Sequence, residues 1–347
     1  MEPKRRRIAH ADVLRKLAAT RGLTHVALSD LLGKLQDAPP ELVTASRSTV
    51  SLAVTTKFDE LSIAIPFALL DGSEFLLEML EPSRLLTEIV RCCPTTAGQY
   101  EEALRDHPST AATPWDLVVG FDEFAPGAKL KVDNKRKVMV LSFSFRQLGQ
   151  WALATGCRWH TPMVVRSSIM HQVQGGWSSI LASFLRRFLL GPQGLSTAGV
   201  VLELSSGLKV LYARLGNLIT DGDGWRLAFD WKGASSHRPC FRHFNVLRKN
   251  SDLAWRRPGY CEVTCTNPAA MKPWAAVDIY SAVDVLAGAL DRVSAGTMTM
   301  ASYKELETAY GLRFNRDGLL AAADLRLLPK SSHVQTRLAA LPLKRIR

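Results

Sequence analysis

Acidic residues follow two apolar segments of the sequence, and this pattern is typical of a metal site. Asp122 and Glu123 come directly after the apolar run at 117–121, and Asp221 follows a second apolar segment, with Asp223 close behind. In α/β sheets, ligand sites form at the ends of strands. We therefore expect Asp122 and Asp221 to lie on adjacent strand ends, with their carboxylates on the order of 4 to 8 Å apart.

A divalent cation would relieve the repulsion between two such carboxylates. Mg²⁺, or Mn²⁺ in its place, prefers a few carboxylates together with water and phosphate oxygens. Two of these ions about 4 Å apart can activate a water and stabilise the leaving oxygen in phosphodiester cleavage. The pattern predicts Asp122, Asp221 and Asp223 as metal ligands, with Asp122 and Asp221 as the catalytic pair. The alternative is that Asp122 and Glu123 only cap a turn.

A basic segment follows the first acids and predicts a nucleic-acid partner. The whole chain carries a formal net charge of +12, which favours a polyanion such as DNA. After the Pro126–Gly127 turn, four cations are expected to contact backbone phosphates: Lys131, Lys135, Arg136 and Lys137. The alternative is a soluble basic protein without such a partner.

Cysteine and histidine residues in the later part of the chain have the spacing of a zinc site. Cys240 and His243 have the spacing of half a zinc knuckle, and Cys261 and Cys265 could complete a set of four ligands, with His237 as a spare. Because no secretory signal accompanies the six cysteines, disulfides are not expected. The alternative to zinc is a group of buried, reduced thiols.

The elements that must position these residues form an α/β domain at 115–328, with a possible zinc-binding insert at 237–265. Apolar periodicity predicts three strands, at 117–121, at 137–145 and in a segment from Met163. A helix follows in "GGWSSILASFLRRFLL", with Ser178 as its cap. Two more strands are predicted at "GVVLEL" and "LKVLYARLGNLI". This order predicts a mixed sheet with flanking helices. The tail at 329–347 diverges from this pattern.

The segment before this domain divides into two parts. Residues 1–50 predict a small helical module, either a helix-turn-helix, in which Arg47 would contact DNA, or a generic helical bundle. Residues 51–114 predict a small β region, with a turn at Asp71–Gly72, and a linker with one helix. The apolar stretches are too short for a membrane span, so we expect no membrane association.

Three segments carry a resemblance to a known family: "VVGFDEFAPGAKLKVDNKRKVMVLSFSFRQLG", "GGWSSILASFLRRFL" and "LGNLITDGDGWRLAFDWKGASSHRPCFRHFNVLRK". They resemble uncharacterised transposase-like proteins that form large multicopy families in some protist genomes, and these are similar to Plavaka-like DDE transposases. The resemblance implies a ribonuclease H-like fold, a nuclear location, and a mobile-element transposase that acts on DNA by metal-assisted phosphodiester cleavage and strand transfer. Asp122 matches the first catalytic acid and Asp221 the second, with Asp223 as a fallback.

The chain departs from the family at several places. His243 stands at the second cysteine of the family's Cys-x-x-Cys, of which Cys240 is the first. The family's third acid lies on a late helix, whereas the tail of this chain contains no acid, so we expect a C-terminal truncation of that helix. Three possible substitutes are Glu305, Glu307 and Asp317. We therefore predict little or no catalysis, and the alternative function is that of a non-catalytic DNA-binding protein derived from a transposase.

Overall fold

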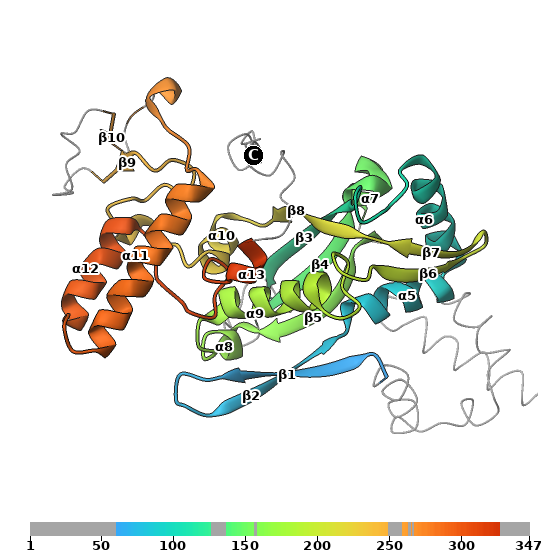
Figure 1. Cartoon of the computed structure of the whole chain (residues 1–347), viewed down its shortest axis with the longest axis horizontal. Coiled ribbons are helices and arrows are strands. Elements are labelled where there is room, and N and C mark those ends of the chain that lie inside the picture. The colour runs from blue at the N-terminus through green and yellow to red at the C-terminus, as the bar shows by residue number, and fades with distance from the viewer. Residues whose placement is uncertain are drawn as a thin grey trace, which may run out of the picture. The chain divides into compact units, whose positions relative to one another are not determined.

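The computed structural model of the protein describes residues 60–125, 137–155, 158–248, 259–262, 265 and 267–326 (Figure 1). Several sequence-based predictions lie outside these described residues. They are the helical module at 1–50 with Arg47, the Pro126–Gly127 turn, the cations Lys131, Lys135 and Arg136, and the tail at 329–347.

The described part of the chain alternates strands and helices. Its strands are β1 (Ser62–Ala68), β2 (Glu74–Leu80), β3 (Trp115–Phe124), β4 (Val138–Phe145), β5 (His160–Arg166), β6 (Val200–Leu204), β7 (Gly207–Leu211), β8 (Ala213–Ile219), β9 (Val246–Leu247) and β10 (Cys261–Glu262). Its α-helices are α5 (Pro82–Cys92), α6 (Pro94–Asp106), α7 (Gly149–Ala154), α8 (Ser167–Met170), α9 (Gly176–Leu185), α10 (Gly222–Ala228), α11 (Ala276–Ser294), α12 (Met300–Tyr310) and α13 (Ala323–Arg326).

A mixed four-stranded sheet, in the order β5-β4-β3-β8, forms the centre of the domain (Figure 1). Strand β3 pairs antiparallel with β4, and β4 with β5, whereas β3 and β8 run parallel. Alternate residues of β3 enter one main apolar cluster, whose largest members include Trp115, Leu117, Phe143, Trp177, Phe184 and Phe188. The α/β class with a mixed sheet, predicted from the sequence, is confirmed.

Helix α9 contributes its apolar side chains to the same cluster, and the ring of Trp177 lies 5.4 Å from that of Phe121 on β3. The prediction that Ser178 caps this helix is wrong. The N-cap is Gly175, whose φ of 76° is a left-handed conformation that glycine adopts readily. Ser178 is buried within the helix, where its hydroxyl donates to the carbonyl of Ala228 at 2.9 Å.

The last predicted strand proves to be two strands. β7 turns back on β6 as an antiparallel hairpin, and β8 then joins β3 in the central sheet. The β3–β8 register shifts at Leu117, and the extra residue on β8 is Gly216. A Cβ atom at Gly216 would lie 2.6 Å from Cβ of Asp116, so the close approach of the two strands requires glycine.

The region before β3 is more ordered than a linker. β1 and β2 form an antiparallel hairpin in the predicted β region, with Asp71 and Gly72 in the turn between them. Residues 81–114 contain two helices, α5 and α6, rather than the single helix predicted. Leu86 of α5 and Tyr100 of α6 are buried in the main cluster, which explains why both helices form.

A second apolar cluster lies in the C-terminal part of the described chain. Helices α11 and α12 pack together there, with Leu286 and Tyr303 buried between them. Trp231 and Leu312 pair as an isolated β-bridge in the same cluster. Among the described residues, no helix is both long and apolar enough to cross a membrane.

A buried histidine makes the stability of this fold depend on pH. His160 is 5% exposed, and burial followed by the charge of Arg158 lowers its pKa from 6.5 to about 4. Its Nε2 atom lies 3.1 Å from the hydroxyl of Tyr100. The neutral imidazole is therefore the form that the folded protein accommodates.

We expect the free energy of unfolding to be highest above pH 6.5, where His160 is neutral in both the folded and the unfolded chain. It should fall as the pH drops from 6.5 toward 4. In this window the unfolded chain binds the proton more readily, and the loss is on the order of 3 kcal/mol. Denaturant unfolding at several pH values would measure it. A His160→Gln variant should show a shallower slope between pH 4 and 6.5, and equal slopes would contradict the prediction.

Candidate functional site

The parallel pairing of β3 and β8 brings the two predicted acids to the same end of the sheet. The last paired residues are Gly120 on β3 and Ile219 on β8, and Asp122 and Asp221 each follow two residues later. Neighbouring strands lie about 4.8 Å apart. The parallel pairing therefore carries the chain at Asp122 and at Asp221 toward the same end of the sheet, and the distance between the two carboxylates stays a prediction.

Asp122 lies within β3 rather than after it. The strand continues to Phe124 and pairs Asp122 with Val140 of β4. The carboxylate of Asp122 is exposed, and its Oδ1 accepts a hydrogen bond from the amide of Glu123 at 2.7 Å. The alternative interpretation of Asp122 and Glu123 as caps of a turn therefore does not describe their backbone, which is β-strand.

Asp221 has a local structural task. It is the N-cap of α10, and its Oδ1 accepts a hydrogen bond from the amide of Gly224 at 2.7 Å. This bond satisfies one of the amides that the first turn of a helix leaves unpaired. Because a carboxylate has two oxygens and about four acceptor positions, the cap leaves acceptor capacity for another ligand.

Glu123 forms an ion pair with Lys137, one of the four cations predicted to contact phosphates. Lys137 donates to its Oε2 at 2.7 Å and Ser167 to its Oε1 at 2.7 Å. Burial alone would raise the pKa of Glu123, but these two hydrogen bonds and the charge of Lys137 outweigh it, and the pKa lies below its usual value. Lys137 is therefore paired with a carboxylate, which reduces the charge that it can offer to a phosphate.

The other predicted acids have surroundings of their own. Asp223 is exposed and lies 3.4 Å from Arg226. Glu307 accepts hydrogen bonds from the amide of Phe314 and the hydroxyl of Tyr303, so it serves the C-terminal helical cluster. Glu305 and Asp317 are exposed. Within the described ranges, no group of three or more His, Cys, Asp or Glu side chains is arranged to hold a metal ion.

Two of the predicted zinc ligands lie close together. Sγ of Cys240 lies 3.3 Å from Nδ1 of His243. Burial raises the pKa of the Cys261 thiol, and Cys265 and Cys240 raise it further. Burial, with a smaller contribution from Arg242, lowers the pKa of His243, which keeps its imidazole in the neutral form that binds metals.

Asn245 organises this region, although nothing in the spacing of the sequence points to it. It is 1% exposed, and its amide nitrogen donates to the carbonyls of Gly259 at 2.6 Å and Ala270 at 2.7 Å. Its Oδ1 accepts from the amide of Lys272 at 2.7 Å. Since its backbone carbonyl also accepts from the amide of Cys261, Asn245 fixes the backbone at that cysteine.

A second residue without a clear signal in the sequence is Asp230, which follows α10. It has a φ of 52°, the single non-glycine residue with positive φ in the described chain. Burial raises its pKa to about 7, against the effect of hydrogen bonds from Ser178 and Asn315. Because Ser178 lies on α9 and Asn315 follows α12, Asp230 belongs to a polar junction between the two apolar clusters and not to the acid pair.

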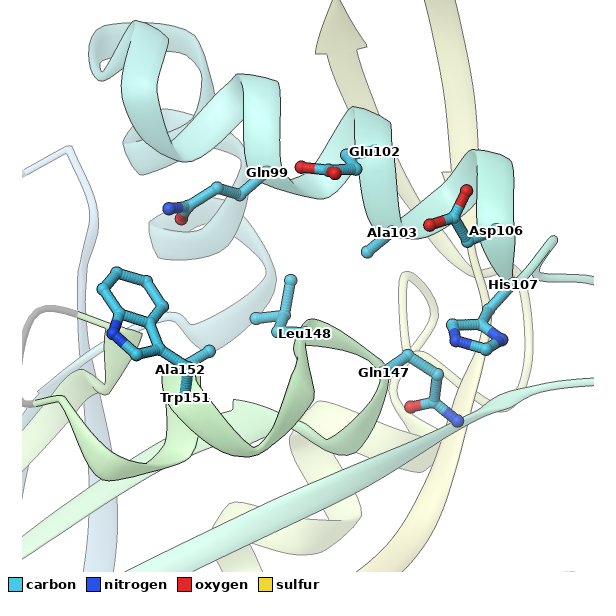
Figure 2. Close-up of a pocket in the computed structure, with 9 residues that line it drawn as sticks. All are labelled: Gln99, Glu102, Ala103, Asp106, His107, Gln147, Leu148, Trp151 and Ala152. Atoms are coloured by element: carbon cyan, nitrogen blue, oxygen red, sulfur yellow. The ribbon is translucent and has the colours of Figure 1, made fainter.

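A separate cavity of about 330 Å³ lies between α6 and the 146–154 segment (Figure 2). Glu102, Asp106 and His107 line one side, with Leu148 and Trp151 opposite. It lies near the start of β3, because the indole of Trp115 donates to the carbonyl of His107. Asp122 stands near the other end of β3, so this cavity is not part of the acid pair.

Comparison with known proteins assigns no family to the chain. No family model matches it, and no curated protein matches it significantly. The contacts and positions of the described residues are therefore the observations on which a function can rest.

Two substitutions of Asp221 test its role as a helix cap independently of any role in binding a ligand. Asp221→Ala should lower the free energy of unfolding by about 1 kcal/mol, because the first turn of α10 loses its cap. Asp221→Asn should leave it nearly unchanged, since asparagine caps helices about as well. Urea denaturation measures both, and an equal loss in the two variants would contradict the capping role.

Proposed function

We propose that this chain is a transposase-derived protein that binds DNA through a ribonuclease H-like domain, with Asp122 and Asp221 as the two carboxylates of a divalent-metal site. The observation that supports the proposal is that β3 and β8 are parallel neighbours, with Asp122 near the end of β3 and Asp221 two residues after β8. The sheet itself is mixed, with helices beside it, as the resemblance implies. Asp122 occurs on its central strand β3, and Asp221 directly after β8.

The acids have the chemistry that a hard cation needs. Both are exposed, both supply carboxylate oxygens, and Asp221 retains acceptor capacity beyond its cap. Mg²⁺ or Mn²⁺, when bound there, would neutralise the two charges and attract phosphate oxygens. The chain's own contribution is to hold the carboxylates: β3 is fixed by β4 and β8 on its two sides, and α10 orients Asp221.

Strand transfer makes a greater demand than metal binding. Positioning two ions for in-line attack needs more protein ligands than a pair, and removing one ion removes either nucleophile activation or leaving-group stabilisation. The described residues supply no group of three acids. We therefore propose DNA binding as the function and expect cleavage to be weak or undetectable.

DNA binding and cleavage can be measured together on the purified chain. Affinity for labelled duplex DNA should fall steeply between about 50 and 200 mM salt, because bound phosphates release counterions. Lys135→Ala combined with Arg136→Ala should reduce the salt slope by about 2, at roughly 0.9 for each phosphate contact. On supercoiled DNA with Mg²⁺ or Mn²⁺, nicking should not exceed that of Asp122→Asn.

The controls and the contrary outcomes are specific. Glu102→Gln removes an exposed acid near the opposite end of β3 and should match the wild type in every assay. Affinity that does not respond to salt would contradict the DNA-binding proposal. Metal-dependent nicking that is lost in Asp122→Asn but kept in Glu102→Gln would show that the acid pair is catalytic after all.

A second proposal concerns zinc, and it rests on the 3.3 Å distance between Sγ of Cys240 and Nδ1 of His243. The spacing of Cys261 and Cys265 in the sequence offers two further ligands, which would have to move toward this pair to close the site. Two or three thiolates and an imidazole are a donor set that suits Zn²⁺. Binding would displace the protons of the thiols, including that of Cys261, whose pKa is raised. Such a site would fix the segment that follows α10.

Purified protein should contain about one zinc ion for each chain by elemental analysis, as a closed four-ligand site requires. Cys240→Ser and Cys265→Ser should each lose it, because a closed site needs all its ligands. Cys92→Ser is the matched control, since Cys92 is an exposed residue of α5 and should leave the zinc content unchanged. Equal zinc content in all four proteins, or none in the wild type, would contradict the site.

A further inference from the structure

Three aromatic rings form a stack immediately after Asp221, and we call Trp225, Phe229 and Phe241 the aromatic platform. Trp225 and Phe229 lie four residues apart around α10, with ring centroids 5.0 Å apart and planes at 12°. The ring of Phe241 continues the stack on Trp225, at 6.1 Å and 11°. Three nearly parallel rings thus come from two segments that are separate in the sequence.

The platform is not simply a part of the hydrophobic interior. In the described chain, Trp225 and Phe241 belong to neither of the two apolar clusters, and Phe241 is 41% exposed. The guanidinium of Arg242 lies 5.9 Å from the centre of the Phe241 ring. Arg226, next to Trp225, is half exposed at its side chain and lies 3.4 Å from Asp223. The platform therefore presents the exposed ring of Phe241, with Trp225 and Phe229 half-buried behind it.

The platform is also close to the acid pair. The amide of Trp225 donates to the carbonyl of Asp221 at 3.1 Å, so Trp225 lies one turn along the helix that Asp221 caps. One helical turn rises about 5.4 Å. If a phosphate of a DNA strand lay near Asp221, the base of the same or the next nucleotide could therefore reach the aromatic platform.

We propose that the aromatic platform stacks an unpaired base of DNA beside Asp221, so that the preferred substrate is DNA with a flap, a gap or an extrahelical base. This inference rests on the DNA-binding function proposed above and names the class of DNA. Every base has a flat π-face, so a stack of rings binds unpaired bases with little regard to sequence. A duplex keeps its base faces covered, whereas the net positive charge of the chain attracts the backbone of either kind of DNA.

The test uses the full chain and two oligonucleotides of equal length, a perfect duplex and the same duplex with one extrahelical 2-aminopurine. The wild type should bind the second more tightly and quench its 2-aminopurine fluorescence, because the probe stacks on a ring. Phe241→Leu keeps an apolar side chain but removes the ring, so affinity for the extrahelical DNA should fall on the order of 5- to 100-fold. Its affinity for the perfect duplex should stay unchanged.

Two further variants control the comparison. Phe241→Trp should restore the preference and the quenching, because indole stacks at least as well as phenyl. Trp151→Leu removes an exposed ring near the other end of β3 and should behave as the wild type does. Thermal unfolding of each variant would show whether the fold is retained.

The outcomes separate this inference from the function on which it rests. Equal wild-type affinity for the two DNAs, or unchanged quenching in Phe241→Leu, would overturn the platform while DNA binding stands. An equal loss for both DNAs together with a lower melting temperature would mean that Phe241 only supports the fold, and would also overturn it. Absence of salt-dependent binding to either DNA would remove the proposed function as well.

Discussion

The parallel pairing of β3 with β8 is the contact on which the candidate site depends. It brings the chain at Asp221, from a distant part of the sequence, to the end of the sheet that carries Asp122, and the two strands approach closely at Gly216. At the same place, Asp116 on β3 is largely buried and accepts a hydrogen bond from Arg214 of β8 at 3.1 Å. A side chain at position 216 would separate the strands, and the two acids would lose their common register.

The polar junction around Ser178 determines how the chain continues beyond α10. Ser178 donates to the carbonyl of Ala228 and accepts from the amide of Leu319, so one buried hydroxyl joins α9 to two later segments. Asn315 adds bonds to the carbonyl of Gly175 and the hydroxyl of Ser179. These bonds anchor the chain on both sides of the C-terminal helical cluster, because buried polar groups are costly when they lack partners. The C-terminal end of α10, the helix that carries Trp225, is therefore held by the hydrogen bond from Ser178 to Ala228.

The sequence predicted the parts of this structure that depend on local pattern. Apolar runs located β3, β4 and the core of α9. The split between β7 and β8 was not predictable, because the apolar pattern continues through Tyr212 without a turn residue, and the boundary depends on which neighbour each half pairs with. Ser178 has the type of a helix cap, but a tertiary bond to Ala228 gives it another position.

Contacts between distant segments account for what the sequence did not predict in the site. The pairing of Lys137 with Glu123 follows from the β3–β4 register, which places the start of β4 opposite the end of β3. The same holds for Phe241, whose position on Trp225 depends on the path of the chain after α10. Asp221 links these observations, because its carboxylate caps the helix that presents Trp225 and its place in the chain directly follows the strand that pairs with β3. A cation bound to the acceptor positions of Asp221 that the cap does not use would leave the hydrogen bond to Gly224 intact. Asp221 could therefore bind a metal ion and cap the helix of Trp225 at the same time.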